Sequence, residues 1–153
     1  MMSFSEIETV SKRASKAIGY SWGISEEIGK SIRILEMFKL PGISTLNQYF
    51  KKIKNNHPKK LKNILKINKS DDELCPIYTG VRILDNCNQL EDLNIIKFFN
   101  INYPLLIIPF LSRSSDIINK PIHVILDQGK YILNCNKTIL TNIEKSNNCK
   151  ISR

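Results

Sequence analysis

The chain has 153 residues, 42% of them hydrophobic and 24% charged, a composition that fits one folded domain and excludes an intrinsically disordered chain. Six glycines and six prolines exclude a collagen-like or proline-rich protein, and no apolar run approaches the roughly 20 residues of a membrane helix. The net charge of +9 invites a nucleic-acid partner, so the location of that charge matters.

The first predicted helix covers Ser3 to Ile18. Ser3 and Glu6 form a capping-box pattern, in which each side chain can bond the backbone amide of the other residue. Apolar residues recur at helical spacing along this segment, and Gly19 is a suitable stop because glycine adopts positive φ without steric cost.

A second helix is predicted to begin with Ser25 as its N-cap and to run to about Leu40, where Pro41 and Gly42 end it. Glu26 and Glu27 then fall in the first turn, where the helix dipole favours anions.

A third helix is predicted from about Ser44 to Asn55, and Pro58 should break it. A fourth, short and lysine-rich helix should follow that proline. Its apolar residues are Leu61, Ile64 and Leu65.

The second half mixes helices and strands. An acidic linker, Ser70 to Glu73, marks the boundary between the halves. We expect a short helix after Pro76 and a strand over Asn94 to Ile101. The next helix begins at Pro104 or at Pro109, because proline is tolerated only in the first turn of a helix.

Whichever proline begins that helix, Leu105 to Leu111 should be buried. The strands Ile122 to Asp127 and Lys130 to Asn134 flank Gln128 and Gly129, which predicts a β-hairpin with a tight turn. Thr138 to Ile143 could add a further strand.

These elements predict an α+β fold, with a helical N-terminal half packed on a small antiparallel sheet that carries one further helix. We expect a helical subdomain over residues 1–69 and an α+β subdomain over 70–146, packed as one compact domain. Residues 147–153 are polar and should form a frayed tail.

The densest group of chemically capable side chains surrounds the start of the second helix. Trp22 should be an anchor wedged between the first two helices. Glu26 and Glu27 could do acid–base work if one were buried. Consecutive helical residues point about 100° apart, so the two carboxylates do not converge on one atom, which favours a capping and dipole role.

Residues 51–69 contain eight lysines and no acidic residue. They could bind a phosphate backbone, anionic lipid or an acidic protein surface. The scarcity of arginine and the abundance of Ile, Lys and Asn, all with AT-rich codons, favour an ordinary solvated helix face. We therefore expect no membrane partner and do not favour nucleic acid. The candidate basic patch comprises Lys51, Lys52, Lys54, Lys59, Lys60, Lys62 and Lys66.

The four cysteines form no CxxC pair, and neither His57 nor His123 stands at a metal-ligand spacing from them. No glycine-rich phosphate loop follows a predicted strand. We expect no metal and no cofactor. The N-terminus shows no secretory pattern, which predicts a cytoplasmic protein with reduced thiols.

The segment GYSWGISEEIGKSIRILEMFKLPG, from Gly19 to Gly42, resembles the opening of a family of small bacterial proteins of unknown function. The shared signature is G-Y-x-W-G-x-x-E-E-x-G. Further matches at Cys75-Pro76 and around Pro104 extend the resemblance over nearly the whole chain. The resemblance implies a fold and no activity. Relatives often have histidine before the proline where this chain has Tyr103, which argues against a catalytic role there.

From these features we expect a non-catalytic accessory or interaction protein that binds a protein partner or itself. One alternative is a small enzyme that uses Glu26 or Glu27 near Trp22 on a small metabolite. The other is a nucleic-acid-binding module that uses Lys51 to Lys69. The candidate functional surface comprises Tyr20, Trp22, Glu26, Glu27, Arg33 and Tyr103.

Overall fold

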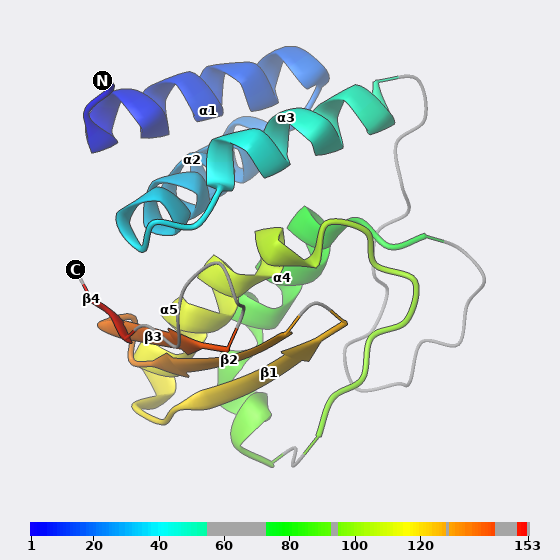
Figure 1. Ribbon diagram of the computed structural model, residues 1–153. Helices are drawn as coiled ribbons and strands as arrows, with labels where there is room; N and C mark the ends of the chain where they lie inside the picture. Colours follow the sequence, from blue (N-terminus) through cyan, green and yellow to red (C-terminus); the bar gives the residue numbers. More distant parts are fainter. Residues whose placement is uncertain (55–72, 93–94, 128, 143–149, 153) are drawn as a thin grey trace.

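The computed structural model describes residues 1–54, 73–92, 95–127, 129–142 and 150–152. Three helices, α1 to α3, form a layer that covers the second half of the chain (Figure 1). Beneath that layer lie α4, α5 and a four-stranded antiparallel sheet. The predicted α+β class is therefore confirmed.

Helix α1 spans Phe4–Ile18 and begins as the sequence predicts. The Ser3 hydroxyl accepts a hydrogen bond from the Glu6 amide at 3.2 Å, and the Glu6 carboxylate accepts one from the Ser3 amide at 2.6 Å. Gly19 ends the helix with φ at 110°, a conformation that glycine adopts without strain. The capping box and the glycine stop are both confirmed.

Helix α2 spans Trp22–Met37, and its N-cap is Ser21 and not the predicted Ser25. The Ser21 hydroxyl accepts from the Ile24 amide at 3.4 Å. Ser25 lies fully buried one turn further in. Helix α1 ends at Gly19, so Ser21 is the first serine after the turn that can act as an N-cap. Helix α2 therefore begins four residues before the predicted position. Glu26 and Glu27 are consequently outside the first turn.

Helix α3 spans Gly42–Ile53, two residues earlier than predicted, with Pro41 as its N-cap. A Cβ on Gly42 would lie 2.8 Å from Cβ of Leu35, so only glycine lets α3 start this close to α2. Leu46, Tyr49, Phe50 and Ile53 line its buried face, as the spacing predicts. The predicted fourth helix, the linker up to residue 72 and the boundary between residues 69 and 70 lie outside the described residues.

Helix α4 spans Pro76–Asp85 with the proline in its first turn, which confirms the predicted short helix. A 3₁₀ helix, η1, follows over Cys87–Asp92. The strand predicted over Asn94 to Ile101 is wrong, because residues 95–100 form none and Ile101 makes one isolated bridge to Leu74. Ile96 and Phe98 do alternate inward, but none of the described strands pairs with them.

The two prolines of the next segment each begin a helical element. A 3₁₀ helix, η2, spans Pro104–Ile107, and α5 continues over Ile108–Ile118 with Pro109 in its first turn. Residues 106–110 are buried, while Leu105 and Leu111 are partly buried, so the predicted apolar segment does enter the core.

The sheet has the strand order β1-β2-β3-β4, with strands Ile122–Leu126, Gly129–Asn134, Thr138–Thr141 and Lys150–Ser152. The predicted hairpin is confirmed, although Gly129 already pairs with Leu126 and so belongs to β2. The tail predicted to fray contains β4, whose Ile151 pairs with Ile139. A short strand in a polar tail has no local signal, because its partner strand supplies the stabilisation.

One apolar core joins the two halves. It includes Ile28, Ile32 and Leu35 of α2 together with Leu133 and Ile139 of the sheet. Helix α5 also packs on β1 and β2. None of the described helices combines the length and the apolar character needed to cross a bilayer.

Candidate functional site

Trp22 is the first residue of α2, and 61% of it is exposed. Two lysines of α1 flank its indole, with Nζ of Lys12 5.6 Å and Nζ of Lys16 5.3 Å from the ring centroid. These distances allow cation–π attraction. The prediction of a buried wedge between the two helices is therefore wrong.

The seam between α1 and α2 explains why the indole lies outside. The buried residues Ser11, Ser15, Ser25 and Gly29 line it. A Cβ on Gly29 would lie 2.7 Å from the carbonyl oxygen of Glu8. The backbones therefore approach too closely for a large ring to enter.

Glu26 lies between Trp22 and the neighbouring cleft, and it pairs with a lysine that flanks the indole. Its carboxylate accepts a hydrogen bond from Lys12 at 2.6 Å, and Lys12 also contacts the indole. The bond and the charge of Lys12 hold the pKa of Glu26 below its ordinary value. Glu26 thus serves an ion pair between α1 and α2, and not the helix dipole as predicted.

A cleft of about 500 Å³ lies beside this ion pair, between α2, α4 and α5. Glu27 spans it by bonding Arg113 of α5 at 2.5 Å, and it also accepts from Lys30 at 2.9 Å. The lining residues are Ser21, Gly23, Ile24, Glu26, Glu27, Val81, Leu84, Asp85 and Arg113.

The half-buried Glu27 stays ionised. Burial pushes the pKa of its carboxyl group upward, but the hydrogen bonds and charges of Arg113 and Lys30 outweigh burial and leave that pKa below its ordinary value. A general acid must hold a proton near neutral pH, and the lowered pKa of both Glu26 and Glu27 disfavours that role.

Basic side chains gather at the same end of the helical layer. The rings of Tyr20, just after α1, and Phe50, near the end of α3, lie 6.1 Å apart, so the two helices end close together. Lys51 and Lys54 are exposed there, whereas Lys52 bonds Glu73 at 2.9 Å. The other members of the predicted basic patch, Lys59, Lys60, Lys62 and Lys66, lie outside the described residues.

Tyr20 belongs to the interior, with only 2% of it exposed. Its hydroxyl donates to that of Tyr49 at 3.5 Å, and the Tyr49 hydroxyl donates to Sγ of Cys75 at 2.9 Å. Burial raises the pKa of both phenols. The partly buried ring of Tyr103 packs edge-on against Tyr49 at 5.8 Å. We name Tyr20, Tyr49, Phe50, Cys75, Tyr78 and Tyr103 the aromatic cluster.

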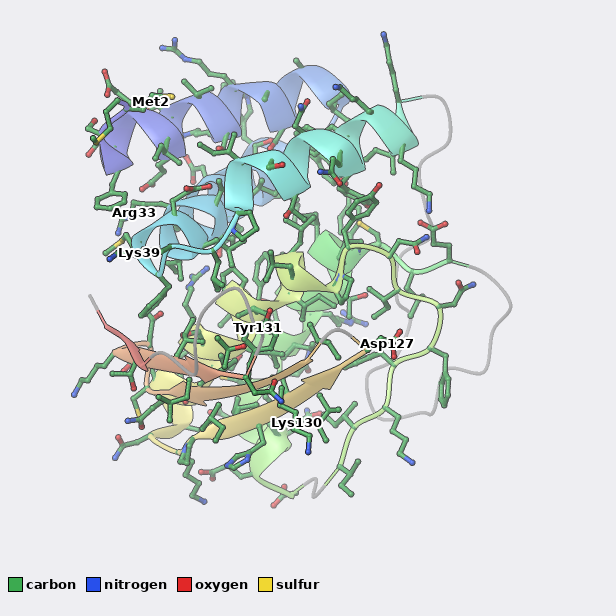
Figure 2. All side chains as sticks on the ribbon, viewed as in Figure 1. Met2, Arg33, Lys39, Asp127, Lys130 and Tyr131 are labelled. Atoms are coloured by element: carbon green, nitrogen blue, oxygen red, sulfur yellow. The ribbon has the colours of Figure 1, made fainter. Side chains whose placement is uncertain are left out.

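Arg33 lies near the opposite end of α2 from Trp22. It bonds Glu8 at 2.8 Å, and Figure 2 shows it at the end of the helical layer that carries Met2 and Lys39. The structure therefore brings Trp22, Glu26 and Glu27 together, while Tyr20 and Tyr103 lie in the aromatic cluster and Arg33 lies elsewhere.

Sequence reasoning missed the basic partners Lys12, Lys16 and Arg113. The four-residue spacing of the two lysines places them on one helix face and could have indicated a pair. Arg113 lies 86 residues from Glu27, and no local pattern indicates that contact.

His123 is exposed on β1, and His57 lies outside the described residues. Within the part of the chain that the structure describes, no three His, Cys, Asp or Glu side chains gather as a metal site would require.

Residues 2–75 match the model of a family described as Protein of unknown function (DUF3726). The match agrees with the resemblance to an uncharacterised family and assigns no activity. No curated protein matches the chain. No solved structure matches it either.

Proposed function

We propose that this protein is a non-catalytic binding protein, and that its working surface is the Trp22 face, formed by Trp22, Lys12, Lys16, Glu26 and the adjoining cleft. The observation that carries the proposal is the 61% exposure of Trp22. Tryptophan is among the residues most enriched at the energetic centres of protein interfaces, and this one carries two lysines beside its ring.

Charge indicates the kind of partner. Lys12 and Lys16 flank the indole, and Lys51 and Lys54 are exposed at the same end of the layer. Complementary potential speeds association and selects partners. We therefore propose an acidic protein segment whose apolar side chain covers Trp22.

The cleft can take an apolar side chain of the same occupant. Ile24, Val81 and Leu84 supply its apolar part, while the carboxylates of Glu26, Glu27 and Asp85 would keep the acidic groups of the partner outside it. A neighbouring apolar side chain of the partner can enter this cleft after the first has covered the indole. The proposal places the protein in the cytoplasm, where we expect its thiols to be reduced.

The state of the carboxylates favours binding over catalysis. Basic partners lower the pKa of both Glu26 and Glu27, so both are ionised at neutral pH and occupied by ion pairs. A small enzyme that used either residue as a general acid would need a carboxyl group that holds a proton near neutral pH.

Trp22 is the sole tryptophan, so its fluorescence reports directly on occupancy of this face. The probe is a synthetic peptide of alternating glutamate and leucine, titrated at low salt. We expect binding with a fluorescence shift, and an affinity loss of about 10-fold or more in the double variant Lys12→Glu/Lys16→Glu.

The matched control is Lys97→Glu/Lys137→Glu, which reverses two exposed lysines on other elements and should change affinity by less than about twofold. Absence of peptide binding, or equal losses in the two double variants, would contradict the proposal. Tighter binding of double-stranded DNA than of the peptide would favour the nucleic-acid alternative instead.

A further inference from the structure

Strand β1 forms one edge of the sheet, since β2 is its only partner among the described strands. Its register with β2 runs unbroken from Ile122 to Leu126. Natural edge strands are usually blunted by a lysine, a proline or a bulge. β1, with the sequence IHVIL, has none of these inside its bounds.

Backbone groups of His123 and Ile125 point away from the sheet. The backbone amide of Lys130 donates to the side-chain Oδ1 of Asn142, and the backbone amide of Asn142 donates to the Lys130 carbonyl at 3.4 Å. Both backbone polar groups of Lys130 therefore face β3. Lys130 and Ile125 are therefore a non-hydrogen-bonded pair. Bonded and non-bonded pairs alternate along an antiparallel ladder, so His123 is in the same state as Ile125.

No described residue outside the sheet forms a backbone hydrogen bond with this edge. The side chains of His123 and Ile125 are exposed as well, and 76% of Ile125 is accessible. The edge thus offers unpaired backbone donors and acceptors beside bare apolar surface, which is the usual template for strand addition.

We propose that β1 pairs antiparallel with β1 of a second copy of this chain, around a two-fold axis at Val124. This inference is independent of the Trp22 face. In that register His123 of each copy lies opposite Ile125 of the other. The backbone amide and carbonyl of His123 each form a hydrogen bond with Ile125 of the other copy. The two-fold axis generates a second, identical pair of hydrogen bonds. The two sheets become one continuous sheet.

Charge also fits a second copy. The register places Asp127 of each chain opposite Pro121 of the other, within reach of the neighbouring Lys120. Asp127 is exposed at one end of β1 (Figure 2). The side chain of Lys120 is 63% exposed beyond the other end, where its ammonium group also pairs with Glu91 at 3.1 Å. Within one chain the two residues lie about 20 Å apart along the strand, so only a second copy can bring them together.

The ends of β1 limit the pairing. Pro121 lacks an amide donor, so the ladder stops there in each copy. A short ladder of this kind predicts a weak dimer, populated at concentrations on the order of 100 µM.

Sedimentation velocity on the full chain tests the proposal. At about 100 µM we expect wild type to contain a substantial dimer fraction that rises with concentration. Ile125→Lys should be monomeric, because the dimer would then hold one added lysine from each copy at the shared β1 edge. The matched control Leu140→Lys adds the same charge to an exposed residue of β3, away from the edge, and should remain dimeric. Far-UV circular dichroism checks that both variants fold.

A charge exchange tests the register separately. Asp127→Lys and Lys120→Asp should each weaken the dimer by about 5-fold, and the double variant should recover to within about twofold of wild type. A monomeric wild type, a dimer that survives Ile125→Lys, a dimer lost in Leu140→Lys, or a double variant without recovery would overturn the proposal. Capture of a strand from another protein at β1, with the chain itself monomeric, would also overturn it.

Discussion

Tyr20 and Trp22 lie two residues apart, yet one is 2% and the other 61% exposed. Tyr20 enters the aromatic cluster, where its hydroxyl bonds that of Tyr49. Trp22 stays outside, flanked by lysines. The contrast separates two uses of aromatic residues, since the aromatic cluster holds α1, α3 and α4 together while the Trp22 face contributes little to the fold.

The difference shows that the type of residue does not decide burial. Tyr20 is buried because its polar atom finds partners inside the core. Trp22 is excluded because serines and Gly29 bring α1 and α2 too close for an indole.

Tyr49→Ala should have the largest effect. Tyr49 is fully buried, donates to Cys75 and accepts from Tyr20, so its removal leaves a cavity and breaks both of these hydrogen bonds. We expect the free energy of unfolding to fall by about 3–5 kcal/mol, measured by urea denaturation with circular dichroism. A loss below about 1 kcal/mol would show that the aromatic cluster is not part of the core.

Gly80→Ala tests the packing of α4 on α5. A Cβ there would lie 2.6 Å from Cγ and 2.8 Å from Cε2 of the buried Phe110 ring, so the ring must shift. We expect a loss of about 1–3 kcal/mol in the same assay. Gly23→Ala is the control, because nothing lies within 4 Å of its added methyl group. It should be neutral or stabilise by up to about 1 kcal/mol, and equal losses in both variants would contradict the packing.

Alkaline pH should weaken the aromatic cluster. Burial raises the pKa of Tyr20 and Tyr49 above the ordinary value of about 10. Their stabilising contribution is complete below pH 10 and is lost as pH rises further, by up to about 1.4 kcal/mol per pH unit for each phenol. Absorbance at 295 nm should show fewer than all five tyrosines ionising in the folded protein near pH 10. Titration of all of them together there would be incompatible with the burial.

Trp22→Ala should have the smallest effect on stability, below about 0.5 kcal/mol, because the ring is largely exposed. The same variant should abolish binding of the acidic peptide, followed with a fluorescent label on the peptide. A loss of more than about 2 kcal/mol would mean that the indole is part of the core.

The sequence predicts what neighbouring residues determine. The capping box of Ser3 and Glu6, the glycine stop at Gly19 and the prolines that begin α4 and α5 act within one turn of helix. The hairpin of β1 and β2 likewise follows from alternation across a short turn.

Distant contacts account for the errors. Residues 95–100 have the composition of a strand, but no strand in the described part of the chain pairs with them, while β4 has a weak pattern but pairs with β3. The site was predicted only in part for the same reason. Glu26 and Glu27 were identified, but Arg113 and the exposure of Trp22 depend on how separate helices pack.

Ionic quenching of the single tryptophan measures both the exposure of Trp22 and the sign of the charge around it. An exposed indole between two ammonium groups should be quenched by iodide at least about threefold more strongly than by caesium at equal ionic strength, because the lysines attract the anion and repel the cation. Lys12→Glu/Lys16→Glu should remove or reverse this preference. Failure of both ions to quench, or equal quenching by both in wild type, would contradict an exposed Trp22 face with a basic surround.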